Sequence, residues 1–234
     1  LPFGRFLYGD LSPIAKGTRF GAAFVDMTLG FALLSALVFL AWLTDRVWPL
    51  WPAFVLALGF ASGLSLSGHS AADAGSSWLS ELADWAHLAA ASLWVGGLIQ
   101  LAFVVWPLEP ELRRRAFLGF SRLATGLIVV ILSAGIYLSV LRLPQLDDLW
   151  GERYGQVLLV KLALVSLALL WGAGHHFLVR PALERGEPLF ARLPRSLAGE
   201  SMVGMAILLA AAVLVDSKPP PKPVSQPPLA QQQR

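Results

Sequence analysis

Hydrophobic positions along the chain fall into long unbroken runs rather than an alternating pattern. A helix needs roughly 20 apolar residues to cross about 30 Å of hydrocarbon. Six runs approach or exceed this length, near residues 21–43, 52–67, 85–106, 117–141, 155–177 and 197–215. The ten-residue alternating segments of a β-barrel are not seen in the sequence. The pattern therefore predicts an all-α fold, a polytopic transmembrane helical bundle of about six spanning helices.

Composition supports a membrane environment. Of the 234 residues, 56% are hydrophobic and only 14% are charged, which is more apolar matter than a soluble globule of this size can bury. The net charge of +3 arises from basic residues in the loops between runs, so it reports orientation rather than nucleic-acid binding. Many of the nine tryptophans lie at run ends, as interfacial rings do: Trp42, Trp48, Trp51, Trp85, Trp106 and Trp150.

The apolar runs divide the chain into three parts. Residues 1–20 are an extramembrane N-terminal segment, 21–215 the transmembrane bundle, and 216–234 a Pro- and Gln-rich tail that we expect to be disordered. The first residue is Leu, with no signal-peptide pattern before the first run, so we expect a fragment or a processed chain.

Charge in the loops predicts orientation. The loop 68–84 carries no Lys or Arg, whereas 107–116 and 178–196 carry three and four arginines. By the positive-inside rule the two basic loops are cytoplasmic, and 68–84 lies outside. Lys16 and Arg19 break the rule locally, which a missing upstream segment would explain.

Polar residues near the outer ends of the first three runs predict a metal site. The chain has no cysteine, so late transition metals must use His, Met or carboxylate ligands. His69 and His87 end and begin consecutive runs, and Asp26 and Met27 lie near the outer end of the first run. Antiparallel packing would bring these four residues together as ligands of copper, zinc or another late transition metal. The alternative is that each histidine only caps a helix at the wet interface.

Further polar residues are expected near the inner ends of the runs. Arg122 and Glu200 occupy matching edge positions, which favours a buried ion pair. Met202 and Met205 could form a soft exit site for Cu(I), although ordinary packing is the simpler account. His175 and His176 are neighbours and point about 100° apart on an α-helix, so both cannot readily face one ion. Lys161 lies two turns in from the outer end of the fifth run.

In these residues the chain resembles the copper resistance protein D (CopD) family of bacterial inner-membrane proteins. The resemblance covers most of residues 54–215 through an ordered set of stretches: "LSLSGHSAA" (64–72), "ELADWAHLAAASLWVGGLIQL" (81–101), "FSRLATGLIVVILSAGIYLSV" (120–140), "RYGQVLLVKLALVSLALLWGA" (153–173) and "RSLAGESMVGMAILLAAAVL" (195–214).

The resemblance implies an all-helical protein of the bacterial inner membrane that takes up or handles copper with a periplasmic copper-binding partner of the CopC type. It also implies family roles for His69, His87, Lys161 and Glu200. Two departures stand out. Family members commonly have about eight spans where this chain has six, and "GAGHHFLVRP" replaces the usual Asn/Arg-rich turn, so His175 and His176 receive no role.

These observations predict a membrane protein, not an enzyme, that binds copper at its periplasmic face and moves it toward or across the membrane. No ATP-binding loop is present in the sequence, so movement would be passive, proton-coupled or driven by delivery from a partner. Two alternatives are a b-type haem electron-transfer protein with histidine axial ligands and an assembly or scaffold subunit without a transported ligand.

Overall fold

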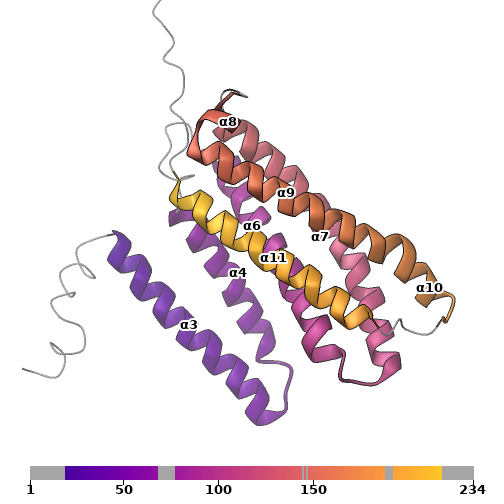
Figure 1. The fold of residues 1–234 in the computed structure, drawn as a ribbon. Coiled ribbons are helices and arrows are strands. Elements are labelled where there is room, and N and C mark those ends of the chain that lie inside the picture. Colours follow the sequence, from indigo (N-terminus) through magenta and orange to yellow (C-terminus); the bar gives the residue numbers. More distant parts are fainter. Residues whose placement is uncertain (1–18, 68–76, 144, 146, 188–191, 218–234) are drawn as a thin grey trace, which may run out of the picture. The chain divides into compact units, whose positions relative to one another are not determined.

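The computed structural model describes residues 19–67, 77–143, 145, 147–187 and 192–217, and these form helices without a strand (Figure 1). The predicted segments 1–20 and 216–234 thus fall almost entirely outside the described residues. The elements follow in this order: α3 (Arg19–Thr44), α4 (Leu50–Ser67), α6 (Trp78–Ile99), η1 (Gln100–Val105), α7 (Pro110–Arg142), α8 (Asp148–Gly151), α9 (Arg153–Gly174), η2 (His175–Val179), α10 (Arg180–Glu184) and α11 (Leu193–Asp216).

Each of the six predicted apolar runs coincides with a helix, which confirms the all-α bundle. Among the described residues, five helical stretches are long and apolar enough to cross a membrane, and Leu50–Phe60 is a shorter apolar stretch. Helices α6 and α7 each begin seven residues before the predicted starts at 85 and 117. The early turns are more polar than the runs, since helices continue past the hydrocarbon into the interface.

The outer surfaces of these helices are apolar. Large hydrophobic side chains such as Trp42, Val140, Leu170 and Leu178 are each more than 70% exposed. Monomeric soluble proteins rarely expose so many large apolar side chains, whereas such a surface is suited to contact with lipid. The chain is a multi-pass membrane protein.

The chain forms two compact units, residues 1–89 and 90–234, with the division inside α6. In the first unit α3 and α4 form a helical hairpin, whose turn includes Asp45 in a left-handed conformation (φ 51°). Phe31 and Phe60 stack across the hairpin with their centroids 5.2 Å apart. The Trp85 indole Nε1 donates a hydrogen bond to the Leu58 carbonyl, 3.1 Å away, and so ties the first part of α6 to α4.

In the second unit, α11 lies along α9 (Figure 1) and also contacts η1. Leu183 and Leu197 are the most deeply buried members of its core, which also contains Val95, Leu98 and Phe117. Helices approach closely at small residues: a Cβ built on Gly204 would lie 2.9 Å from Val95 Cγ2. Because lipid is as apolar as the side chains, such close packing is a main source of helix association in membranes.

Gly155 provides a test of this packing. A Cβ at this position would overlap the backbone of Asp148 and Leu149 in α8, whereas a Cβ at Gly126 of α7 would meet nothing within 4 Å. We expect Gly155→Ala to lower the free energy of unfolding by about 1–3 kcal/mol, because backbone atoms cannot move aside. Gly126→Ala is the matched control and should be neutral or stabilising. Thermal unfolding of both variants in detergent measures the difference, and equal midpoints would contradict the packing argument.

Candidate functional site

A buried carboxylate, Glu200, lies inside the second unit. It is the eighth residue of α11, about 10 Å from the start of the helix, and only 2% of it is exposed. An ionisable group in a membrane bundle is costly unless it is hydrogen-bonded, and such groups commonly mark pathways for ions or protons. Glu200 is therefore the natural starting point for a functional site.

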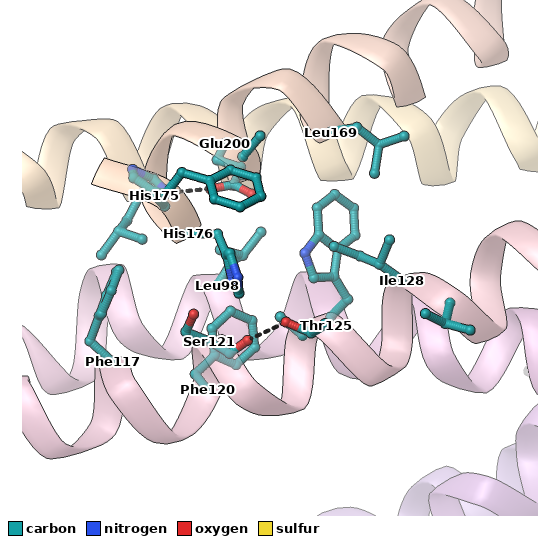
Figure 2. Close-up of a pocket in the computed structure, with 17 residues that line it drawn as sticks. Leu98, Phe117, Phe120, Ser121, Thr125, Ile128, Leu169, His175, His176 and Glu200 are labelled. Carbon is teal, nitrogen blue, oxygen red and sulfur yellow. Dashed lines mark hydrogen bonds and ion pairs between the residues drawn. The ribbon is translucent and has the colours of Figure 1, made fainter. Parts of the chain in front are cut away.

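His175 is the hydrogen-bond partner of this carboxylate. Its Nδ1 lies 2.8 Å from Glu200 Oε2 (Figure 2). Its Nε2 lies 2.9 Å from Ser196 Oγ, so both ring nitrogens are occupied. The Trp171 indole Nε1 donates to the same Ser196 hydroxyl oxygen, 2.8 Å away. The side chains of His175 and Glu200 are only 12% and 3% exposed. Four side chains from two helices thus form one continuous polar network.

Helical spacing explains how the sequence builds this network. Trp171 and His175 are four residues apart near the junction of α9 and η2, and Ser196 and Glu200 are four residues apart on α11. Residues at this spacing share one helix face. Because α9 and α11 pack together, each helix presents a pair of polar groups to the other.

Glycines let the two helices come close enough. A Cβ on Gly172 would lie 3.2 Å from Glu200 Oε1, and one on Gly199 would lie 2.7 Å from Trp171 Cη2. The edge of the His175 ring also meets the Phe117 ring, with centroids 6.2 Å apart at 81°. The network is therefore held by packing as well as by hydrogen bonds.

A cavity of about 280 Å³ adjoins the network. His175, His176 and Glu200 contribute its titratable groups, and its other walls are mainly apolar and aromatic, including Trp94, Phe117 and Phe120. Figure 2 shows the His176 side chain directed toward α7, where Ser121 and Thr125 complete the lining. The site is a mostly apolar chamber with one polar wall.

The π-helical segment η2 explains why adjacent histidines line the same cavity. It begins at His175 and ends at Val179. A π-turn contains more residues than an α-turn, so neighbouring residues are rotated by a smaller angle. The α-helix expected from the sequence separates the directions of the His175 and His176 side chains by a larger angle than the π-turn does. Nothing in the sequence indicates the π-turn.

The predicted ion pair between Arg122 and Glu200 is wrong. The Glu200 carboxylate is bonded to His175, whereas Arg122 is exposed on α7, and no ion pair joins the two in the part of the chain that the structure describes. A buried imidazole in the adjacent helix reaches the carboxylate directly. An arginine at the membrane edge instead extends its charge toward the polar interface.

Other predicted residues lie apart from the network. Lys161 is half-buried on α9. Met202 and Met205 are 72% and 44% exposed on α11, while their respective neighbours Ser201 and Gly204 are buried. The described residues therefore give no support to an inner exit site at the two methionines, which lie on the apolar outer face of the helix.

The four predicted copper ligands belong to the first unit. Met27 is half-buried on α3 and His87 is half-buried on α6. Asp26 lies on α3, but its side chain is outside the described part of the structure, as is all of His69. His87 is nine residues after the start of α6, about 14 Å along the axis, and is therefore further from the start of its helix than a helix beginning at 85 would place it.

No metal centre stands out among the described residues: no group of three or more His, Asp or Glu side chains there could hold a metal ion. His175 and His176 are neighbours on one segment rather than on facing helices, so they cannot bind opposite faces of one haem. The geometry of the second unit thus does not favour the haem alternative.

Comparison with known proteins adds to this picture. Residues 114–214, which contain the whole network, match the family model described as Copper resistance protein D. Copper transport protein CutJ of Bacillus subtilis (strain 168) is 34% identical over 151 residues, or 62% of this chain and 27% of that protein. Copper resistance protein D of Pseudomonas syringae pv. tomato is 33% identical over 165 residues, or 65% of this chain and 51% of that protein.

The chain thus spans about a quarter and about half of the length of these curated relatives. No solved structure matches it. The matched family segment does not include His69 or His87.

Removing the imidazole tests the network. We expect His175→Ala to lower the free energy of unfolding by about 3–5 kcal/mol, since it leaves the Glu200 carboxylate buried without its partner. Arg122→Ala should change it by no more than about 0.5 kcal/mol, because Arg122 is exposed and unpaired with Glu200. Denaturant unfolding in mixed micelles compares the two variants. A larger loss in Arg122→Ala than in His175→Ala would restore the arginine as the partner of Glu200.

Proposed function

Because this chain belongs to the copper resistance protein D family, we propose that it handles copper, taking up copper ions on the periplasmic side of a bacterial inner membrane and passing them toward or across it. Copper as the cargo is supported by the match of residues 114–214 to the family model. The names of the two relatives, which state copper transport and copper resistance, support it as well. Copper is the substrate in this proposal and not a resident cofactor.

The bundle interior supports a transport role over a purely structural one. A scaffold subunit gains no stability from a carboxylate and an imidazole inside the membrane, because a well-packed apolar pair is often as stable or more so. The second unit nevertheless buries Glu200 and His175 beside a cavity. Polar groups next to a cavity inside a membrane protein are typical of pathways for ions, protons or substrates.

We assign copper capture to the first unit. It contains the helices that bear Asp26, Met27 and His87, and Asp26 and Met27 are adjacent on α3. Imidazole, carboxylate and thioether are the ligands that a protein without cysteine can offer to copper. His69, next to the end of α4 in the sequence, completes the proposed ligand set.

Delivery of copper from a periplasmic binding protein of the CopC type fits this assignment. The capture residues would receive the ion from such a partner at the membrane face. Transfer between two proteins requires ligands that exchange readily, and imidazole and thioether groups can leave one at a time. This partnership rests on the family resemblance.

The capture site is tested by copper binding to the purified protein. We expect His87→Ala to weaken copper affinity by at least about tenfold. Even the loss of a residue that only orients a metal ligand typically has an effect of this size. His69→Ala should do the same, and the double variant should add little because two ligands of one ion are coupled. Binding should also weaken on acidification, since protons compete for imidazole.

Glu81→Gln, in the first turn of α6, is the control for general effects on that helix and should bind copper as the wild type does. Equal copper affinity in the wild type and in the double histidine variant would refute the capture site.

The orientation has its own test, which the lack of native cysteine simplifies. We expect Ala72→Cys in intact spheroplasts to react with an impermeant thiol reagent, and Glu109→Cys to react only after lysis. The charge difference between the two loops gives this expectation. If only Glu109→Cys were labelled in intact spheroplasts, the orientation would be the opposite of the one proposed.

A further inference from the structure

The hydrogen-bond network has a defined direction. At one end the Trp171 N–H can only donate, so Ser196 Oγ accepts from it. The single Ser196 hydroxyl hydrogen can then be donated to His175 Nε2, and the Nδ1–H of the same ring to Glu200 Oε2. Every link is filled by one hydrogen when His175 is neutral and Glu200 is ionised. This arrangement carries one buried negative charge.

The second carboxylate oxygen is the place where the network can accept a further proton. Glu200 Oε1 lies beside Gly172 and makes no hydrogen bond to the described residues. No fully buried side-chain oxygen or nitrogen among these residues lacks a partner, so Oε1 is open to the cavity that Glu200 lines. A proton bound there leaves all three existing hydrogen bonds in place.

Protonating His175 instead would disturb the network. A hydrogen on Nε2 would point at Ser196 Oγ, which already accepts from Trp171. The serine hydroxyl would lose its acceptor and would have to turn away. Protonation of Glu200 Oε1 therefore keeps all the hydrogen bonds of the network, whereas protonation of His175 requires the serine hydroxyl to find another acceptor.

Electrostatics favours this uptake. A lone negative charge in a low-dielectric interior is costly, and binding one proton makes the network neutral. Among the described residues that line the cavity, none is a fixed cation that could offset this charge. From η2 the facing titratable groups are His175 and His176, and the cavity-lining residues of α6, α7, α9 and α11 add no other charged or titratable group than Glu200 itself.

We propose that Glu200, held by His175, is a proton-binding site within the membrane, and that it exchanges one proton with the adjoining cavity. His176 lines the same cavity and is placed to pass the proton in or out. In this step a proton binds to a lone pair of the carboxylate oxygen, and the same proton leaves on release. Coupling of this exchange to copper movement rests on the proposed function.

Infrared difference spectroscopy of the metal-free protein in lipid tests the site. When the pH is lowered from a neutral to an acidic value at which the protein stays folded, we expect one carboxylic-acid carbonyl band from Glu200 to appear. The band should be absent in Glu200→Gln and kept in Glu184→Gln, which removes an exposed carboxylate paired with Arg180. In parallel, ¹⁵N spectra should show His175 as the Nδ1–H tautomer at both pH values.

Two glycine variants keep the test valid if Glu200→Gln does not fold. Gly172→Ala places a methyl group against Glu200 Oε1 and should shift the carbonyl band, whereas Gly174→Ala meets nothing within 4 Å and should not. The absence of a new carbonyl band in the wild type would overturn the proposal. A carbonyl band that neither Glu200→Gln nor Gly172→Ala changes would also overturn it. So would a spectrum in which His175 becomes imidazolium while Glu200 stays ionised.

Proteoliposomes loaded with a pH indicator separate this inference from the proposed function. Copper-dependent proton movement that is lost in Glu200→Gln but kept in Glu184→Gln supports coupling through Glu200. Copper movement without any proton movement would remove the coupling and leave the proposed function intact. Protonation of Glu200 in a protein that moves no copper would instead remove the proposed function and leave the proton site.

Discussion

The buried Glu200 carboxylate is the constraint on which the second unit depends. A charge at 2% exposure is tolerated inside an apolar bundle only if hydrogen bonds replace its lost water. His175 supplies that bond, Ser196 bonds to the other nitrogen of the imidazole, and Trp171 donates to the Ser196 oxygen. Each polar group requires the next one, so the network specifies how α9 and α11 align along their axes. Packing alone, which depends on repeated small residues, would specify this alignment less strictly.

Close packing and the polar network support each other. Gly172 and Gly199 leave room for the Glu200 and Trp171 side chains that lie against them, and the donor and acceptor atoms of the network are 2.8–2.9 Å apart. The π-turn at His175 then adds a second effect, because it turns His176 toward the same cavity. Segments of this kind recur at functional sites because they redirect side chains at the cost of weaker local hydrogen bonding.

The sequence predicted the helices better than the site. Apolar runs of spanning length leave few alternatives in a membrane, so all six were found, whereas the first turns of α6, α7 and α11 and the short helices α8 and α10 were missed. The site depends on which faces of α9 and α11 meet. The four-residue spacing of Trp171 with His175 and of Ser196 with Glu200 was visible in the sequence, but the packing that pairs them was not. The choice of Arg122 as the partner of Glu200 came from matching depth alone, which says nothing about the direction in which a side chain points.

The same network also bears on where copper can bind. Both nitrogens of His175 and one oxygen of Glu200 are already used in hydrogen bonds, so a metal ion could take His175 as a ligand only by breaking the network that keeps Glu200 in the bundle. A proton can bind without breaking these hydrogen bonds, because it needs only a free lone pair of Glu200 Oε1. The buried pair is thus better suited to a proton than to a metal. Copper is better suited to residues that can rearrange at a membrane face, which is why the cargo site and the proton site are assigned to different units.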